Sequence, residues 1–232
     1  MNHKKAALFA AFPHTIPVMT GYLVLGAAYG ILMNSKGISL LWVLLSSIFI
    51  YAGSMQFVAV ALLSAGFHPL NTFFMTLMVN ARHLFYGISM LGKYRGMGKF
   101  KPYLIFSLTD ESFSILCSTE PPEGIERRLF MFYVSLLDQI YWITGSVVGA
   151  VLGSLIQFNT NGIDFVLTAL FVVILVNQWQ QTTNHLPVIT GILCGILCLI
   201  IFGPDHFLLP TMISIILIVT LLKKPMQRGT IQ

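Results

Sequence analysis

The sequence predicts an all-α integral membrane protein, a polytopic helical bundle of six to eight hydrophobic segments that makes one membrane domain over residues 1–232. Two observations carry this prediction. Of the 232 residues, 56% are apolar and 9% are charged, and the mean hydropathy is +0.82, whereas about a quarter of an ordinary globular domain is charged. The apolar residues also gather in runs of roughly 20, the length that crosses a bilayer. Such a chain cannot surround a soluble core with a polar surface.

Eight hydrophobic segments can be drawn, separated by short gaps rich in Gly, Pro and Asn. They cover residues 18–33, 40–63, 70–91, 102–117, 129–156, 163–179, 186–202 and 207–222. Before the first segment, Pro13 and Pro17 are expected to break the apolar run, so no removable signal peptide is expected. Within it, Gly21, Gly26 and Gly30 make a stripe of small residues that favours helix packing.

The basic residues in the gaps favour one topology over another. Eight straight crossings would put seven of them on one side, Lys4, Lys5, Arg127, Arg128, Lys223, Lys224 and Arg228, and five on the other, Lys36, Lys93, Arg95, Lys99 and Lys101. If the segments around residues 51–57 and 107–117 are instead re-entrant or broken, six crossings remain and eleven basic residues face Lys36 alone. The second arrangement follows the positive-inside rule with both termini cytoplasmic, and it resembles inverted transporter repeats.

An arginine lies near the centre of the third segment, in Asn80-Ala81-Arg82-His83. Helical spacing puts Arg82, Tyr86 and Ser89 on one face, with Asn80 and His83 on its flank. A buried guanidinium matches a substrate carboxylate, although a purely structural ion pair is the alternative. His83 can relay protons or serve as a hydrogen-bonded core residue.

Two adjacent carboxylates, Asp110 and Glu111, lie midway through the fourth segment. Ser107, Glu111 and Ser114 share a face if that helix is continuous. Desolvation and mutual repulsion both disfavour two charged carboxylates, which makes this pair a candidate proton-coupling site. The alternative is that the pair lies near an interface and one acid merely balances Arg82.

Two further places carry polar groups at membrane depth. In the second segment, Gly53 and Ser54 are a candidate helix break and Gln56 can donate and accept hydrogen bonds, although ordinary small-residue packing explains the same residues. In the fifth segment, Asp138 would complete the polar cavity or pair with Arg82.

Several classes of function are disfavoured. The chain has no zinc-protease helix, nucleophile elbow or phosphate loop, which argues against an enzyme. The basic residues lie in gaps and not on a face with aromatic residues, so nucleic acid is not expected. Three cysteines, Cys117, Cys194 and Cys198, fit packing better than a disulfide or metal site, and no cofactor is expected. Asp164 fits the start of a helix.

Four motifs, in this order and spacing, resemble the AzlC family, the large subunit of two-component branched-chain amino-acid exporters. They are residues 21–30, residues 52–57, residues 80–83 with Tyr86 and residues 109–113, and the match continues to residues 163–165 and 169–171. The resemblance implies export of leucine, isoleucine and valine, with methionine as a further candidate, from the cytoplasm across the inner or plasma membrane. It also implies coupling to protons and a small hydrophobic AzlD-type subunit, and it leaves homo-oligomers of such heterodimers open.

These observations lead to one hypothesis. Arg82 binds or positions the group that binds the substrate carboxylate, with Asn80, Ser54, Gln56 and Tyr86 as further polar contacts. The coupling proton would be taken up by an acid or imidazole from the set Asp110, Glu111, His83 and Asp138, and the aliphatic side chain would lie near Met55, Phe57 and Phe85. A channel or passive permease for another small polar solute is the alternative, and a structural subunit that acts through a partner is a third.

Overall fold

A computed structural model of the protein describes residues 3–155, except residues 65 and 67, and residues 185–203; between 165 and 180 and between 207 and 218 it describes single residues and short stretches. The elements of the described residues are helical, and the chain forms two compact units, Met1–Leu167 and Thr168–Gln232. The predicted segments over residues 163–179 and 207–222, Asp164 and the carboxyl terminus lie wholly or largely outside the described residues.

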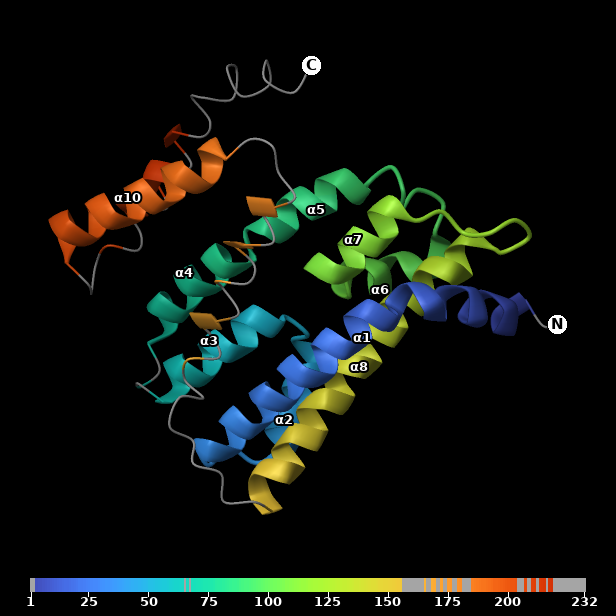
Figure 1. Cartoon of the computed structure of the whole chain (residues 1–232), viewed down its shortest axis with the longest axis horizontal. Coiled ribbons are helices and arrows are strands. Elements are labelled where there is room, and N and C mark those ends of the chain that lie inside the picture. The colour runs from blue at the N-terminus through green and yellow to red at the C-terminus, as the bar shows by residue number, and fades with distance from the viewer. Residues whose placement is uncertain are drawn as a thin grey trace. The chain divides into compact units, whose positions relative to one another are not determined.

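The first unit is built around two long helices, α1 (His3–Ser35) and α8 (Arg127–Leu155), which lie side by side and run in the same direction (Figure 1). Small residues allow this close approach: a Cβ atom at Gly26 would lie 2.9 Å from the backbone nitrogen of Ser146, and one at Gly149 would overlap the Ala27 backbone. The expected packing role of Gly26 and Gly30 is confirmed, whereas a Cβ at Gly21 would meet nothing within 4 Å.

The prediction that two prolines end the apolar run before the first segment is wrong. Helix α1 continues through Pro13 and Pro17 from His3. A proline removes one backbone hydrogen bond and bends a helix, and membrane helices tolerate this because nearby groups satisfy the freed carbonyls. The Thr15 hydroxyl donates to the Phe12 carbonyl in this stretch at 2.9 Å.

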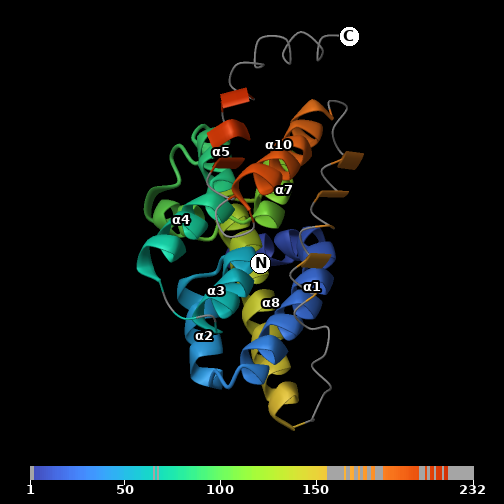
Figure 2. The same cartoon turned by 90° about the vertical axis from the view of Figure 1, so that its left-hand side faces the viewer.

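The second predicted segment is a hairpin of two short helices, α2 (Leu40–Phe49) and α3 (Gly53–Ser64), which lie beside each other in both views (Figures 1 and 2). The break at residues 50–52 contains Tyr51, whose φ of +44° lies in the left-handed region that few non-glycine residues adopt. The start of α2 and the end of α3 line one cavity, since both Ser39 and Ser64 border it. The segment therefore returns to the end from which it entered.

The third segment consists of α4 (Pro69–Asn80) and α5 (Arg82–Met90), separated by a turn at Ala81 directly before Arg82. The sequence pattern did not indicate this interruption. The carboxyl end of α5 packs with the amino-terminal halves of α1 and α8, because Met90, Ala11 and Phe130 belong to one buried cluster. Helices α4 and α5 together therefore run opposite to α1.

The fourth segment is a second hairpin, α6 (Lys101–Phe106) and α7 (Asp110–Ser118), which follows a short 3-10 turn, η1 (Gly98–Phe100). The Lys93 ammonium, ahead of α6, donates to the Leu116 carbonyl at 2.9 Å and the Cys117 carbonyl at 2.7 Å, at the end of α7. Both ends of this hairpin thus lie together.

The unit has two distinct ends. At the basic end, α1, α6 and α8 begin and α5 and α7 finish, together with Lys93, Arg95, Lys99 and Lys101. At the Lys36 end, α1 and α8 finish and the first hairpin enters. In the described residues, the second and fourth segments are hairpins of short helices and not straight crossings. This is the arrangement that the charge count favours.

Among the described residues, α1 and α8 are long and apolar enough to cross a membrane, with mean hydropathies of 1.7 and 1.3 over 18 residues. In the second unit, α10 (Leu186–Phe202) coincides with the predicted seventh segment. A proline in its first turn and Gly203 after its last, at φ +74°, are the usual start and stop signals.

Candidate functional site

The tips of both hairpins meet at Arg82, the first residue of α5. One guanidinium nitrogen, Nη2, donates to the Ser54 hydroxyl at 3.0 Å, and Nη1 lies 3.0 Å from the Asp110 carboxylate. The two charged side chains are 28% and 26% exposed. Of the acids that the sequence offers as partners for Arg82, the one that pairs with it is Asp110. Because Arg82 also contacts Ser54, its side chain connects the interruptions of both hairpins.

This ion pair is only half satisfied. The buried atoms Arg82 Nε and Asp110 Oδ1 have no hydrogen-bond partner among the described residues. A guanidinium can grip a carboxylate with two parallel bonds, yet here only one bond is formed. Arg82 therefore retains donor capacity for a second carboxylate, and Asp110 retains an acceptor.

The second hairpin breaks where a helix start is strongly encoded. Thr109 and Ser112 form a reciprocal capping box: the Thr109 side chain accepts from the Ser112 amide, and the Ser112 side chain accepts from the Thr109 amide. Asp110 and Glu111 occupy the first turn of α7, where negative charge offsets the helix dipole. The predicted shared face of Ser107, Glu111 and Ser114 is wrong, because Ser107 precedes the break.

Glu111, the next residue of this turn, contacts α1. The Tyr22 hydroxyl is 2.6 Å from Glu111 Oε2 and 2.8 Å from the Thr109 hydroxyl. Tyr22 is 5% exposed and its ring packs edge-on against Trp142 of α8. The two adjacent acids thus have different partners: Asp110 contacts Arg82 and interacts with Tyr86, and Glu111 contacts Tyr22.

Asp138 of α8 is completely buried, and neither carboxylate oxygen has a hydrogen-bond partner among the described residues. The hydroxyls of Ser135 and Tyr51 are buried and unpartnered as well. Asp138 interacts electrostatically with Glu111 and Tyr51. The expected pair of Asp138 with Arg82 is wrong, because Arg82 contacts Asp110. That Asp138 completes a polar cavity stays a prediction.

Gln56, 1% exposed, connects the first hairpin with α8. Its carbonyl accepts from the Trp142 indole at 2.9 Å. On the same helix α8, Gln139 donates to the Ile48 carbonyl at 3.1 Å and accepts from the Tyr103 hydroxyl at 2.7 Å. The amides thereby tie the tips of α2 and α6 to the long central helix.

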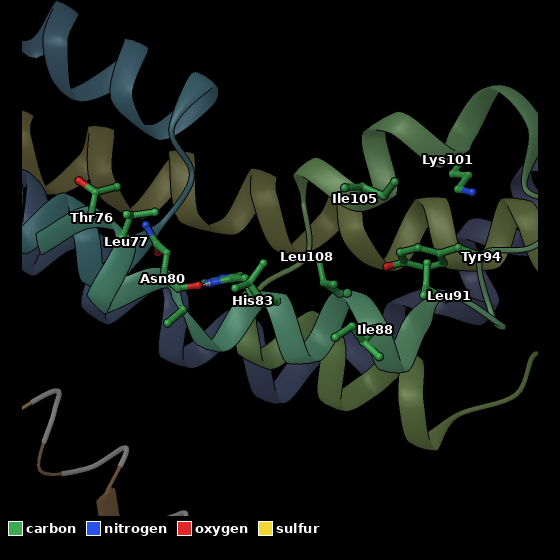
Figure 3. Close-up of a pocket in the computed structure, with 13 residues that line it drawn as sticks. Thr76, Leu77, Asn80, His83, Ile88, Leu91, Tyr94, Lys101, Ile105 and Leu108 are labelled. Atoms are coloured by element: carbon green, nitrogen blue, oxygen red, sulfur yellow. Dashed lines mark hydrogen bonds between the residues drawn. The ribbon is translucent and has the colours of Figure 1, made fainter. Parts of the chain in front are cut away.

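Asn80 and His83 border a half-open cavity of about 550 Å³ beside α4, α5 and α6 (Figure 3). His83 Nδ1 lies 3.2 Å from the Asn80 carbonyl, and the cavity extends toward Tyr94 and Lys101 at the basic end. Its lining is mostly aliphatic, with Leu108 of the second hairpin tip among the residues that border it.

Tyr86 stacks on Phe113 with ring centroids 4.5 Å apart, and it interacts electrostatically with Asp110. This contact holds α5 against α7. Of the three residues expected near the aliphatic side chain, Met55 and Phe57 are buried and Phe85 is 70% exposed.

Sequence reasoning missed four participants: Tyr22, Tyr51, Thr109 and Trp142. Thr109 carries a usable signal, since a threonine before two acids marks a helix start. The three aromatic residues have no such sequence signal, because Tyr and Trp are common in membrane helices for reasons unrelated to a site. Among the described residues no cluster of three or more His, Cys, Asp or Glu is arranged to hold a metal ion.

The fold and this site define a class: a helical membrane protein in which two broken helices bring polar and charged groups together at their interruptions. Residues 17–156 match the family model described as AzlC protein, so the chain belongs to the AzlC family. It is 49% identical over 226 residues to the branched-chain amino acid transport protein AzlC of Bacillus subtilis, covering 97% of this chain and 89% of that one.

Two further relatives have less specific names. An uncharacterized membrane protein of Helicobacter pylori strain 26695 is 42% identical over 94% of this chain and 95% of its own. The inner membrane protein YgaZ of Escherichia coli is 28% identical over 78% of each chain. No solved structure matches the chain.

Proposed function

We propose that this protein exports branched-chain amino acids, leucine, isoleucine and valine, from the cytoplasm in exchange for protons. The observation that carries the proposal is the half-satisfied pair of Arg82 and Asp110 between the two hairpin tips. A half-buried charge pair with one unused donor atom and one unused acceptor atom is suited to a zwitterion. The name of the Bacillus subtilis relative supports the substrate class.

The two hairpin tips suggest how a zwitterion would be oriented. The substrate carboxylate would accept from Arg82 Nε and approach the amino-terminal end of α3, where the residue before the helix, Ala52, offers no capping oxygen. Helix amino termini attract anions. The substrate ammonium would approach Asp110 Oδ1. Ser54 and Tyr86 would position the guanidinium and the carboxylate that receive it.

Two carboxylates are the candidates for the coupling proton. Glu111 shares a short hydrogen bond with Tyr22, and neither oxygen of Asp138 has a hydrogen-bond partner in the part of the chain that the structure describes. An acid without a counterion in a dry interior is stable only when neutral or when an arriving cation balances it. Asp138 and Glu111 interact electrostatically, so uptake of a proton by one would change the electrostatic energy of a charge on the other. His83, whose Nδ1 contacts the Asn80 carbonyl at the end of α4, is a further candidate and borders the cavity that extends toward the basic end.

The charge distribution supports an orientation with the basic end cytoplasmic. The amino terminus then lies inside, and the first hairpin enters from outside. From the family resemblance we retain a small AzlD-type membrane subunit as part of the proposal. Exposed apolar residues along α4 and α5, such as Leu77, Leu84 and Ile88, offer surface for lipid or for such a subunit.

Efflux of preloaded leucine or valine from vesicles tests the proposal. The protein, produced together with any small membrane subunit encoded beside it, should release leucine faster than empty vesicles, and an inward proton gradient should accelerate release. Arg82→Ala and Glu111→Gln should each lower this rate at least tenfold. Wild-type rates in both variants would refute the assignment of residues, and release without any dependence on the proton gradient would favour a channel.

A further inference from the structure

A second cavity lies at the Lys36 end, away from the Arg82 pair. It is half-open, has a volume of about 670 Å³, and is enclosed by α1, α2 and α3. Sites for small molecules usually measure about 300–1,000 Å³, so this one is large enough for an amino acid with water. It begins at the loop between α1 and α2 and reaches Ile50, beside the tip of the first hairpin.

The floor of this cavity carries an under-used donor. Gln56 Nε2 lies 3.4 Å from the Ser46 hydroxyl and 3.5 Å from the Ser47 hydroxyl, and Gln56 also interacts with the Tyr29 hydroxyl, whereas good N–H···O bonds are near 2.9–3.0 Å. Its carbonyl is engaged by Trp142, which fixes the direction of the amide. Tyr29 and Ser46 contribute hydroxyls 2.8 Å apart on the same floor.

The walls are apolar and the rim is basic. Met33, Trp42, Val60 and Leu63 surround the space above the floor, and Lys36 lies at the rim. Polar groups, among them Tyr29 and Gln56, together with aliphatic walls match a small molecule that carries a carboxylate and a branched hydrocarbon chain. A lipid acyl chain would not improve on the long contacts that Gln56 Nε2 makes with Ser46 and Ser47, whereas a carboxylate would.

This cavity is distinct from the Arg82 site although both use α3. Ser54 faces Arg82, and Gln56 follows it by two residues, which is about 200° around a helix. The two side chains therefore point to nearly opposite sides of α3. A substrate on Gln56 and a substrate on Arg82 would be separated by the helix itself.

We propose that this cavity is a second amino-acid site, on the outward face, which holds the substrate after it leaves Arg82. Gln56 and Tyr29 bind its carboxylate, and Met33, Val60 and Leu63 contact its aliphatic chain. The inference rests on the proposed export function for the identity of the ligand. It adds a release site whose occupation does not require Arg82.

Protection of a cysteine from labelling tests the site directly. Ala59 borders the cavity, and Ala61, two residues further on the same helix, is exposed and does not. In a protein whose three native cysteines are replaced, Ala59→Cys should react with a membrane-impermeant maleimide from outside, and saturating leucine should slow this reaction at least fivefold. Ala61→Cys is the matched control and should react at the same rate with and without leucine. An unchanged rate at position 59 would overturn the site, as would equal protection by a branched alcohol without a carboxylate.

Repeating the labelling with Arg82→Ala separates this inference from the proposed function. Leucine should still protect Ala59→Cys in that background, although efflux is lost. Protection without efflux in the otherwise unchanged protein would mean that the export function fails and the site stands. Efflux without protection would mean that the site fails and export stands. As a further check, Ala59→Trp should lower leucine efflux at least tenfold, whereas Ala61→Trp should stay within twofold of the parent.

Discussion

The two hairpins of the first unit share a shape and differ in their tips. In the second hairpin, the first turn of α7 is capped by Thr109 and Ser112 and carries Asp110 and Glu111. In the first hairpin, Ala52 precedes α3, so the residue at the cap position has no side-chain oxygen, and the nearest charge is Arg82, bound to Ser54. One helix start is electrically balanced by its own residues, and the other is not.

The difference in capping suggests that the two hairpin tips bind different groups. A helix start that its own residues cap is a stable element that can present acids to a proton or an ammonium group. At a helix start without a cap, the first backbone N–H groups have no side-chain acceptor, and here the Arg82 Nε beside them is also unused. Such donors can bind an anionic ligand. On this view the first hairpin receives the carboxylate and the second receives the cations.

Neutralising the charges that join the tips should have the largest effect. We expect Arg82→Gln or Asp110→Asn alone to lower both folded yield and leucine efflux, the latter about 100-fold or more, since leaving one partner of a buried pair costs about 3–5 kcal/mol. The double variant should recover yield and thermal stability but not efflux, measured in the same vesicles. The exposed pair Arg128 and Glu126 is the control: its double glutamine variant should behave like the parent. Recovery of efflux in the double variant at position 82 would show that the pair is only structural.

Glu111, the acid of α7 that contacts Tyr22 of α1, should separate coupling from substrate binding. Glu111→Gln should lower export driven by a proton gradient about 10- to 100-fold, while exchange of internal for external leucine stays within a few-fold of wild type, because exchange needs no net proton movement. Counterflow of labelled leucine measures the second rate. Glu120→Gln, an exposed acid that pairs with Lys93, is the control and should change neither rate. Equal losses in both assays would assign Glu111 to binding and not to coupling.

Placing an acid at the bare tip would make the two hairpins alike. Ala52→Asp should raise the KM for leucine efflux about tenfold, because the new carboxylate competes with the substrate for Arg82 and for the start of α3. Ala52→Asn has nearly the same shape without the charge and should change KM much less. If both variants raise KM equally, crowding and not charge is responsible, and the first tip is not the carboxylate site.

Removing the cap from the second tip should have the smallest effect. Thr109→Val replaces by a methyl group the hydroxyl that accepts from the Ser112 amide and from Tyr22. A lost cap costs about 1 kcal/mol, which lowers the melting temperature of a protein of this size by about 2–4 °C. Thr109→Ser should restore most of it in a thermal-shift measurement. No loss in the valine variant would show that the box does not hold the break.

Much of this arrangement follows from the sequence. The composition predicts the helices, the charge count favours the hairpins, and the positions of Arg82 and Asp110 at membrane depth require partners. These features have strong signals because a charge in hydrocarbon is costly at any position. The charge count places the two interruptions near residues 51–57 and 107–117. The first lies at residues 50–52, just before the expected break at Gly53-Ser54, because these two residues already belong to α3.

Other features could not be predicted because they depend on how helices pack. The absence of a partner for Asp138 follows from which face of α8 meets α1 and the hairpins, and no local pattern encodes this. The continuation of α1 through Pro13 and Pro17 depends on neighbours that tolerate a bend. Likewise, Tyr22 meets Glu111 only because α1 passes beside the start of α7.

The central claim, that Arg82 binds the substrate carboxylate at the first hairpin tip, is tested most directly by a cycle of binding measurements. Calorimetry on the purified protein would compare leucine with leucinamide, which lacks the carboxylate, in wild type and in Arg82→Lys. Loss of the carboxylate and loss of the guanidinium should each weaken binding about tenfold or more, and the two losses together should cost hardly more than either alone. Losses that simply add would place the carboxylate elsewhere and contradict the account.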